Sequence, residues 1–215
     1  MAVHRAADRG PDRMAALEQY RRRAEGYDRE LALFEPIRTD AVAKLDLHPG
    51  DTVLDVGCGT GLSFGLLHNR IGKGGRIVGI EQCPEMFAKA QARVDANHWR
   101  NMDLVCAPAA TARVPLKADA ALFHFTHDVL RDPQSIANVL SHLKPGARVV
   151  ASGLQWAPPW LAPTNVFVLM AAMYSVTSLE GLSQPWDRLA AHMRGVEVET
   201  ALMGGIYIAS GRLRG

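Results

Sequence analysis

T-V-L-D-V-G-C-G-T-G, residues 52–61, is the stretch that decides the fold. A β-branched apolar run containing one acid leads into glycines at alternate positions, Gly57, Gly59 and Gly61, and a helix-like segment follows over residues 62–70. This order predicts a strand, a tight turn and a helix. Glycine suits the turn because it adopts positive φ angles and places no side chain between the backbone and a flat ligand. The stretch therefore predicts a platform for a nucleotide-like ligand.

The composition predicts one globular domain. A chain of 215 residues can bury one sizeable α/β core and leaves little for a second. Apolar residues make up 48% and charged residues 21%, a balance that argues against extensive disorder. The formal charge of +2 is too small to indicate a nucleic-acid partner. We predict a flexible tail over residues 1–12 and a single domain over residues 13–215.

The cysteines and the N-terminal residues predict a reduced setting. Cys58, Cys83 and Cys106 are odd in number and too scattered for a zinc site, so neither a disulfide framework nor a structural metal is expected. The first residues lack the apolar run of a signal peptide. We therefore predict a cytoplasmic protein.

Strand-like and helix-like segments alternate after residue 51, which favours a parallel sheet with crossover helices. The expected strands cover residues 52–56, 76–81, 102–107, 119–125 and 148–153, and the expected helices residues 62–70, 84–97, 133–143 and 185–193. Two earlier helices, over residues 12–33 and 36–45, would form an N-terminal cap that spans residues 13–48.

A long uncharged segment follows the fifth strand. No Asp, Glu, Lys, Arg or His occurs between Arg148 and Glu180. Three prolines interrupt its first half, so the remaining apolar helix is too short to cross a bilayer, which needs roughly 20 residues. We expect a proline-rich loop and a buried helix within a lid over residues 155–194. The chain then ends in two strands, residues 196–203 and 206–213, joined by a glycine pair as in a hairpin.

These features together resemble the class I S-adenosylmethionine-dependent methyltransferases. The resemblance rests on Asp55-x-Gly57-x-Gly59-x-Gly61, on Glu81 at the end of the next strand, on L-K-P-G-A before strand five and on the terminal hairpin. Position 62 holds leucine, so the third glycine of the dehydrogenase pattern is absent. The resemblance implies a Rossmann-like seven-stranded sheet of order 3-2-1-4-5-7-6, with strand 7 antiparallel and helices on both faces.

The resemblance also implies S-adenosyl-L-methionine as the cofactor. The glycines would admit its methionine part, Asp55 would orient water or its amino group, and Glu81 would accept hydrogen bonds from both ribose hydroxyls. Cys58 is interpreted as a small space-filling residue of the turn. The residues implied in cofactor binding are Asp55, Gly57, Cys58, Gly59, Gly61, Glu81, Gln82, Met86, Ala107, Pro108, His124 and Tyr27.

The sequence departs from the family at the end of strand three. The family often places an acid there to bond the adenine amino group, whereas this chain has A-P-A-A from Ala107. A backbone N–H at Ala107 or Ala109 is the expected substitute, because Pro108 has no N–H to donate.

The tract F-H-F-T-H-D, residues 123–128, holds the candidate catalytic residues. The end of strand four faces the reactive end of the cofactor in such folds, and a histidine there can accept a proton near neutral pH. His127 and His124 are therefore the candidate bases. The alternatives are that His127 hydrogen-bonds Asp128 and that His124 only forms a wall of the site. His127 and Asp128 alone do not indicate a metal site.

The predicted activity is methyl transfer to an O or N atom of a small, partly hydrophobic acceptor, either a natural product or a lipid-like molecule. The pattern is similar to enzymes of the ubiquinone-biosynthesis and phospholipid N-methyltransferase type. Two alternatives stay open, a cofactor-binding protein without transfer activity and an NAD-type oxidoreductase. The apolar lid leaves two further partners open, a peripheral membrane contact and a second copy in a homodimer.

Overall fold

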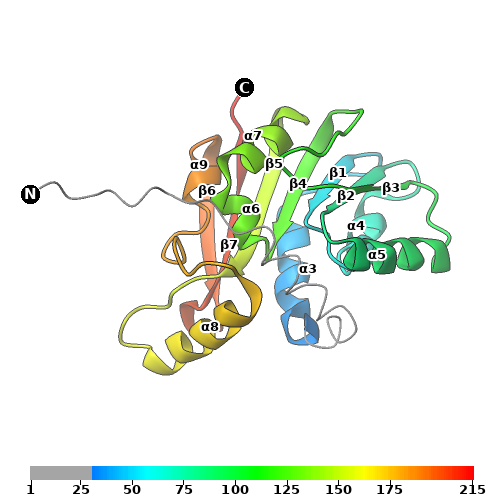
Figure 1. The fold of residues 1–215 in the computed structure, drawn as a ribbon. Helices are drawn as coiled ribbons and strands as arrows, with labels where there is room; N and C mark the ends of the chain where they lie inside the picture. Colours follow the sequence, from blue (N-terminus) through cyan, green and yellow to red (C-terminus); the bar gives the residue numbers. More distant parts are fainter. Residues whose placement is uncertain (1–30) are drawn as a thin grey trace, which may run out of the picture.

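A computed structural model describes residues 31–215 (Figure 1). The predicted tail, most of the first cap helix and Tyr27 lie outside the described residues. The described chain begins with a short 3-10 helix, Leu31–Phe34, and continues directly into α3, Glu35–Lys44. Proline in the first turn of α3 fits the helix start, because its missing N–H has no partner there in any helix.

The sheet confirms the predicted topology. Its seven strands have the order β3-β2-β1-β4-β5-β7-β6. β7 pairs antiparallel with both β5 and β6, and the other neighbours pair in parallel. The strands are β1 (Thr52–Val56), β2 (Arg76–Glu81), β3 (Met102–Cys106), β4 (Ala118–His124), β5 (Leu143–Leu154), β6 (Met193–Ala201) and β7 (Ile206–Leu213).

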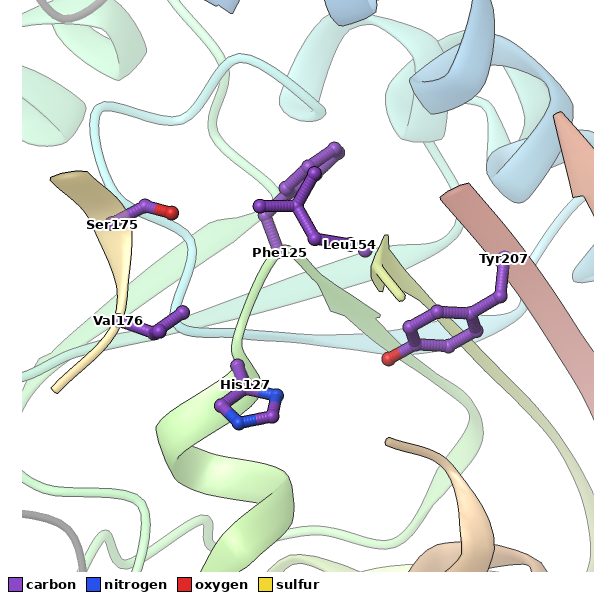
Figure 2. A pocket seen from close by; sticks show the side chains of 7 residues that line it. Phe125, His127, Leu154, Ser175, Val176 and Tyr207 are labelled. Atoms are coloured by element: carbon purple, nitrogen blue, oxygen red, sulfur yellow. The ribbon is translucent and has the colours of Figure 1, made fainter. Parts of the chain in front are cut away.

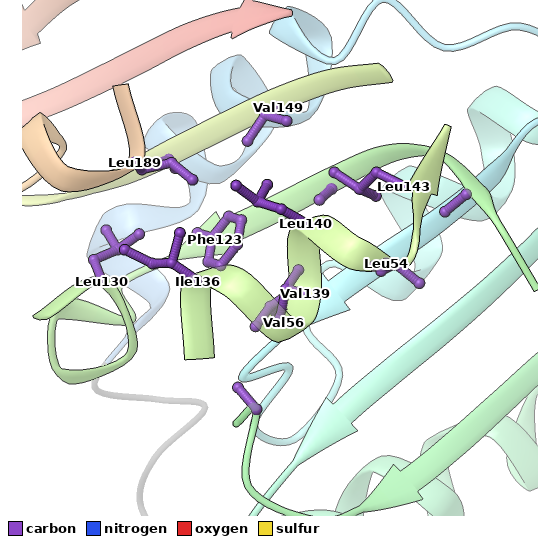
Figure 3. Packing of buried hydrophobic residues seen from close by; sticks show 14 of the residues in the cluster. Leu54, Val56, Phe123, Leu130, Ile136, Val139, Leu140, Leu143, Val149 and Leu189 are labelled. Carbon is purple, nitrogen blue, oxygen red and sulfur yellow. The ribbon is translucent and has the colours of Figure 1, made fainter. Parts of the chain in front are cut away.

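Helices cover both faces of this sheet, as predicted. The remaining helices are α4 (Phe64–Ile71), α5 (Pro84–Ala96), α6 (His127–Arg131), α7 (Pro133–Ser141), α8 (Ala162–Ser175), α9 (Asp187–Ala190) and the 3-10 turn η2 (Leu202–Gly204). One buried apolar cluster joins the sheet to α3, α4, α5 and α8, and a second joins it to α6, α7 and α9. In the second cluster, Ile136 and Leu130 pack near Phe123 of β4 (Figure 3).

Alternate residues of each inner strand enter different clusters, as the two-residue period of a strand requires. Leu54 and Val56 of β1 belong to the cluster with α6 and α7, whereas Val53 belongs to the cluster with α3. Strands buried on both faces read as continuous apolar runs. Polar residues in these strands therefore contrast with the apolar runs, and they occur near the carboxyl ends, along one edge of the sheet.

Several boundaries differ from the sequence predictions. β5 begins at Leu143, because L-K-P-G forms an irregular start whose pairing with β4 shifts between Ala118 and Ala120. β6 begins at Met193, the last residue of the helix expected over residues 185–193, and α9 has only four residues. The short helix α6 was not predicted.

The prediction of a buried helix after strand five is wrong for most of α8. Among the α8 side chains that the structure describes, only a narrow stripe is buried: Thr164, Val168 and Ala172. Bulky apolar side chains lie exposed on the rest of its surface, including Met170 and Met173. The absence of charge indicates an apolar helix, but an apolar helix can have one covered face and leave the rest of its surface exposed. Across residues 31–215, every helix falls short of the length and apolar character that a bilayer-spanning segment needs.

Candidate active site

The glycine turn after β1 is held against β2 by backbone hydrogen bonds. The N–H groups of Gly57 and Cys58 both donate to the carbonyl oxygen of Ile80, at 2.8 and 3.0 Å. Gly57 has a φ of +66°, and a Cβ atom added to it would lie 2.6 Å from Cγ2 of Thr126. Glycine is therefore required here by backbone conformation and by the close approach of the segment after β4.

Glu81 ends β2 with a buried carboxylate beside this turn. One oxygen accepts from the N–H of Gly59 at 2.9 Å and the other from the N–H of Cys83 at 2.7 Å. Burial raises the pKa of Glu81, and the N–H groups of Cys83, Gly59 and Gln82 oppose that shift by stabilising the charged form. A carboxylate has about four acceptor positions, so the fixed side chain can still receive a ligand hydroxyl group.

Asp55 lies within β1 and is only 2% exposed. Burial raises its pKa from 3.8 to about 7, the positive charge of Arg38 opposes this shift, and the negative charge of Glu81 adds to it. Its Oδ2 atom has no hydrogen-bond partner among the described residues. Native proteins rarely leave a buried carboxylate oxygen unbonded, so this atom marks a place where a polar ligand group or water fits.

Arg38 is a site residue that the sequence analysis missed. It projects from α3, is 1% exposed and forms an ion pair with Glu35. Its charge acts on both Asp55 and His124, and its Nε atom has no partner within residues 31–215. The available signal was an arginine on the apolar stripe of α3, since Ile37, Ala41 and Val42 are buried on the same helix.

Further predicted cofactor-binding residues follow the ends of β2 and β3. Met86 is buried at the start of α5 and Gln82 is half-buried beside Glu81. Ala107 follows β3, and its N–H already donates to the carbonyl oxygens of Glu81 at 3.0 Å and Val105 at 3.1 Å. That N–H is thus engaged in the sheet and is a poor substitute for the missing acid. Pro108 lies half-buried next to it.

Cys58 has the properties of a space-filling residue. Burial raises the pKa of its thiol well above 9, and the nearby carboxyl groups of Asp55 and Glu81 raise it further. A thiol with a raised pKa is a poor nucleophile at neutral pH. All three cysteines are free thiols.

His124 ends β4 in a buried, polar corner. Its Nδ1 atom lies 2.7 Å from the hydroxyl oxygen of Ser152 on β5, and its Nε2 atom is buried without a partner in the described chain. Burial lowers its pKa from 6.5 to about 3, and the charge of Arg38 contributes to that shift. The ring is therefore neutral at physiological pH.

His127 begins α6 and lines a pocket at the carboxyl ends of β4 and β5 (Figure 2). Its Nε2 atom lies 3.0 Å from the carbonyl oxygen of Glu180, and its Nδ1 atom has no partner among the described residues. His127 therefore does not hydrogen-bond Asp128, the alternative that the sequence leaves open. Burial lowers the pKa of His127. The pocket is lined by Phe125, His127, Gly153, Leu154, Ser175, Val176 and Tyr207.

The structure places the predicted cofactor-binding residues and the candidate catalytic residues side by side along one edge of the sheet. Thr126 touches the turn at Gly57 and is followed directly by His127 of the pocket, so the cofactor and catalytic candidates adjoin. Sequence analysis missed Tyr207 and Gly153, which reach the pocket from distant parts of the chain. Within residues 31–215 no three His, Cys, Asp or Glu side chains are grouped to hold a metal ion.

Comparison with known proteins agrees with this geometry. Residues 53–146 match a family described as a methyltransferase domain. A 2-phytyl-1,4-naphtoquinone methyltransferase from Thermosynechococcus vestitus is 30% identical over 62% of this chain and 65% of its own length. The chain spans only 32% to 54% of the length of three other curated relatives.

Solved structures share the fold at low sequence identity. A putative methyltransferase from Haloferax volcanii, solved with its activator Trm112, has a TM-score of 0.70 at 17% identity and covers 92% of this chain and 98% of its own. The [4+2]-cyclase SpnF has a TM-score of 0.60 at 19% identity and covers 82% and 79%. The sheet order, the glycine turn and the methyltransferase domain matched over residues 53–146 all resemble the class I S-adenosylmethionine-dependent methyltransferases, whose cofactor is S-adenosyl-L-methionine.

Proposed function

We propose that the protein transfers a methyl group from S-adenosylmethionine to an O or N atom of a small, partly hydrophobic acceptor. The observation that carries the proposal is the position of Glu81, whose buried carboxylate is fixed beside the glycine turn. The unpartnered oxygen of Asp55 supports it, because the cofactor's cationic amino group is a suitable partner. The glycine turn, Glu81, Gln82 and Met86 would hold the cofactor, and Tyr27 stays a prediction.

The cofactor supplies an electrophilic methyl group on a positively charged sulfur. The chain's own contribution is to hold an acceptor close to that group and to remove the acceptor's proton where it has one. His127 is the proposed base. Its Nε2 atom faces a carbonyl oxygen, which only accepts, so Nε2 carries the proton and Nδ1 is free to take another. Burial keeps this ring neutral and hence basic at pH 7.

The pocket walls support an acceptor with an apolar body. Phe125, Leu154 and Val176 contribute carbon surface beside His127 (Figure 2). The relative from Thermosynechococcus vestitus is named for a substrate that combines a naphthoquinone with a phytyl chain. We therefore propose a natural product or lipid-like acceptor for this chain.

Calorimetric titration tests the cofactor assignment. The protein should bind S-adenosylmethionine and S-adenosylhomocysteine but not NAD. Glu81→Ala should weaken S-adenosylhomocysteine binding by about 1.5 to 3 kcal/mol, the range for hydrogen bonds to a charged group. Glu197→Ala, which removes an exposed acid from β6, is the matched control and should bind as the wild type does. Failure to bind either sulfur compound would reject the proposal.

A second candidate function is cofactor binding without methyl transfer. The missing acid after β3 favours it, and a protein of the same fold is named for a cyclisation. Under this alternative S-adenosylhomocysteine binds, Glu81→Ala weakens it, and no acceptor is methylated. Incubation with radiolabelled S-adenosylmethionine and a panel of hydrophobic phenols and amines separates the two functions.

The exposed face of α8 is the proposed place of contact with a membrane surface or a second copy. Val166, Phe167, Met170 and Met173 are exposed on it, and Trp160 just before the helix is 81% exposed. Sedimentation with phosphatidylcholine vesicles and light scattering without them distinguish these two partners. Met170→Glu should abolish whichever contact occurs, whereas Ala88→Glu on the exposed surface of α5 should leave it unchanged.

A further inference from the structure

The pocket beside His127 is too small for an acceptor as it stands. It has room for about one water molecule, whereas pockets that hold small organic ligands measure roughly 300 to 1,000 Å³. Ser175 and Val176 form its wall on the side away from Tyr207 (Figure 2). Part of the wall must therefore move before an acceptor with an apolar body can reach His127.

Ser175 and Val176 begin a weakly anchored segment, residues 175–181, which we call the flap. Every residue of the flap is half-buried or exposed. Ala172 before it and Leu182 after it are both 0% exposed, so its two ends are fixed in the core. A segment with few buried apolar contacts can open locally at low free energy while the rest of the protein stays folded.

The helix α6 holds the flap through polar contacts. Nε2 of His127 donates to the carbonyl oxygen of Glu180 at 3.0 Å, and Oδ1 of Asp128 accepts from the N–H of Thr177 at 3.4 Å. Nη2 of Arg131 lies 2.6 Å from Oε2 of Glu180, whose side chain is 69% exposed. An ion pair so open to solvent contributes little to stability. The contacts that close the flap are therefore individually weak.

Closure of the flap also leaves polar atoms of α6 unbonded. Nδ1 of His127 and Oδ2 of Asp128 are buried without a partner among the described residues. A buried polar atom without a hydrogen bond costs free energy, and water can bond it once the covering segment lifts. The closed arrangement thus combines weak contacts with a cost that opening relieves.

We propose that residues 175–181 open away from α6 to admit the acceptor, and that the ion pair between Arg131 and Glu180 controls this opening. The inference rests on the proposed function, since it describes how an acceptor reaches the same site. Opening also exposes Nδ1 of His127, the proposed base.

A thiol inside the closed pocket reports on opening of the flap. A Cβ atom added to Gly153 would lie 3.5 Å from Cε1 of Tyr207, which is an ordinary contact, so Gly153→Cys places a thiol in the pocket. Iodoacetamide is larger than water and can reach this thiol only when the flap is open. Mass spectrometry measures the alkylation of each cysteine separately in the full chain.

Two natural cysteines supply the reference rates. Cys106 is exposed, whereas Cys83 is 0% exposed and reacts only when the protein unfolds. The thiol introduced by Gly153→Cys should react at least about tenfold more slowly than Cys106 and at least about tenfold faster than Cys83.

Variants of the ion pair test its control of the flap in the Gly153→Cys chain. Glu180→Ala should accelerate alkylation in the pocket about 2- to 5-fold, as expected for a partly exposed ion pair, and leave Cys83 unchanged. Exchange of the charges, Arg131→Glu with Glu180→Arg, should return the rate toward its original value. Asp103→Ala is the matched control, because it removes an exposed ion pair with Arg76 far from the flap.

Hydrogen exchange measures the same opening in the chain that keeps Gly153. Amides of residues 175–181 should exchange faster than those of β5, and Glu180→Ala should accelerate exchange in the flap alone. This measurement tests the proposal even where Gly153→Cys does not fold.

The outcomes separate the flap from the function on which it depends. A pocket thiol as slow as Cys83 shows that the pocket opens only with unfolding, and one as fast as Cys106 shows that nothing closes it, so either result overturns the flap. Unchanged alkylation and exchange in Glu180→Ala overturn the role of the ion pair. Absence of S-adenosylhomocysteine binding rejects the proposed function, while the alkylation and exchange rates still test the flap.

Discussion

The carboxyl ends of β1 and β2 and those of β4 and β5 form two halves of one site, and they differ in how completely their polar groups are bonded. We call the first half the cofactor half. Its glycine turn, the end of β2 and Glu81 are joined by hydrogen bonds, and all of these residues lie within 30 positions of one another in the sequence. In the second, the acceptor half, residues 124–128 supply four of the seven buried side-chain atoms without partners among the described residues. The cofactor half has one such atom among the described residues, Oδ2 of Asp55, so the acceptor half has more hydrogen-bonding capacity left for a ligand.

The contact between Gly57 and Thr126 joins the two halves, and breaking it should have the largest effect. Gly57→Ala combines a positive φ with a Cβ only 2.6 Å from Cγ2 of Thr126, so we expect it to lower the free energy of unfolding by about 2 to 5 kcal/mol. Gly50→Ala has a positive φ but open space, and should cost only about 1 to 2 kcal/mol. Urea denaturation measures both.

Adding Thr126→Ser to Gly57→Ala removes the obstructing Cγ2 atom. The double variant should recover part of the lost stability, about 1 to 2 kcal/mol, because the overpacking is relieved and the backbone strain remains. If Gly57→Ala and Gly50→Ala cost the same, the close approach of the two halves is not what requires glycine at this position.

The next largest effect is expected in the acceptor half. His127→Ala should lower turnover by roughly 10²-fold or more and leave cofactor affinity unchanged, because the variant removes only the proposed base. His124→Asn is the comparison, since His124 bonds Ser152 and does not line the pocket. Single-turnover kinetics with radiolabelled S-adenosylmethionine and an acceptor from the panel measure both. A larger loss in His124→Asn would assign the base to His124 instead.

A proton on Asp55 should make the cofactor half sensitive to pH. Burial raises its pKa to about 7, so the side chain is mostly neutral at pH 6 and mostly ionised at pH 8. Only the ionised form attracts the cofactor's ammonium group. S-adenosylhomocysteine should therefore bind up to about tenfold more tightly at pH 8 than at pH 6, with release of a proton.

Calorimetry in buffers of different ionisation enthalpy measures that proton. Asp55→Asn should abolish both the proton release and the dependence of affinity on pH. A wild-type affinity that is constant between pH 6 and pH 8 would show that Asp55 does not face the ammonium group.

The acceptor half should show the smallest response to pH. Burial lowers the pKa of His127 below 6.5, so its basic form is already complete at pH 7.5 and is lost only as the pH falls below 6.5. At saturating cofactor, turnover should change less than about twofold between pH 7.5 and 8.5. A steep rise over this interval in the pH–rate profile would indicate a base with a higher pKa.

The two halves also differ in how far the sequence predicts them. Glu81 and the glycines could be assigned because their motif is local and each residue lies at a strand end or in the adjoining turn. Tyr207 and Gly153 are 54 positions apart, and only the antiparallel register of β5 and β7 makes them neighbours. Arg38 was missed because helical spacing indicates which face is buried, but not which acid an arginine on that face will meet.

In α8 the sequence predicts burial, and the structure shows exposed side chains instead. The uncharged segment from residue 149 to residue 179 correctly predicted a helix without a membrane-spanning length, but not its exposure. An apolar sequence indicates that a helix can be covered, but not whether the surface that covers it belongs to the same chain or to a partner.

The antiparallel β7 has a consequence for the order in which the protein matures. Proteins are synthesised from the N-terminus, so the glycine turn and Glu81 leave the ribosome more than a hundred residues before Tyr207. A growing chain that ends after β5 would have the cofactor residues but an unpaired sheet edge and no tyrosine in its pocket. The pocket beside His127 is therefore completed only by the strand that closes the sheet.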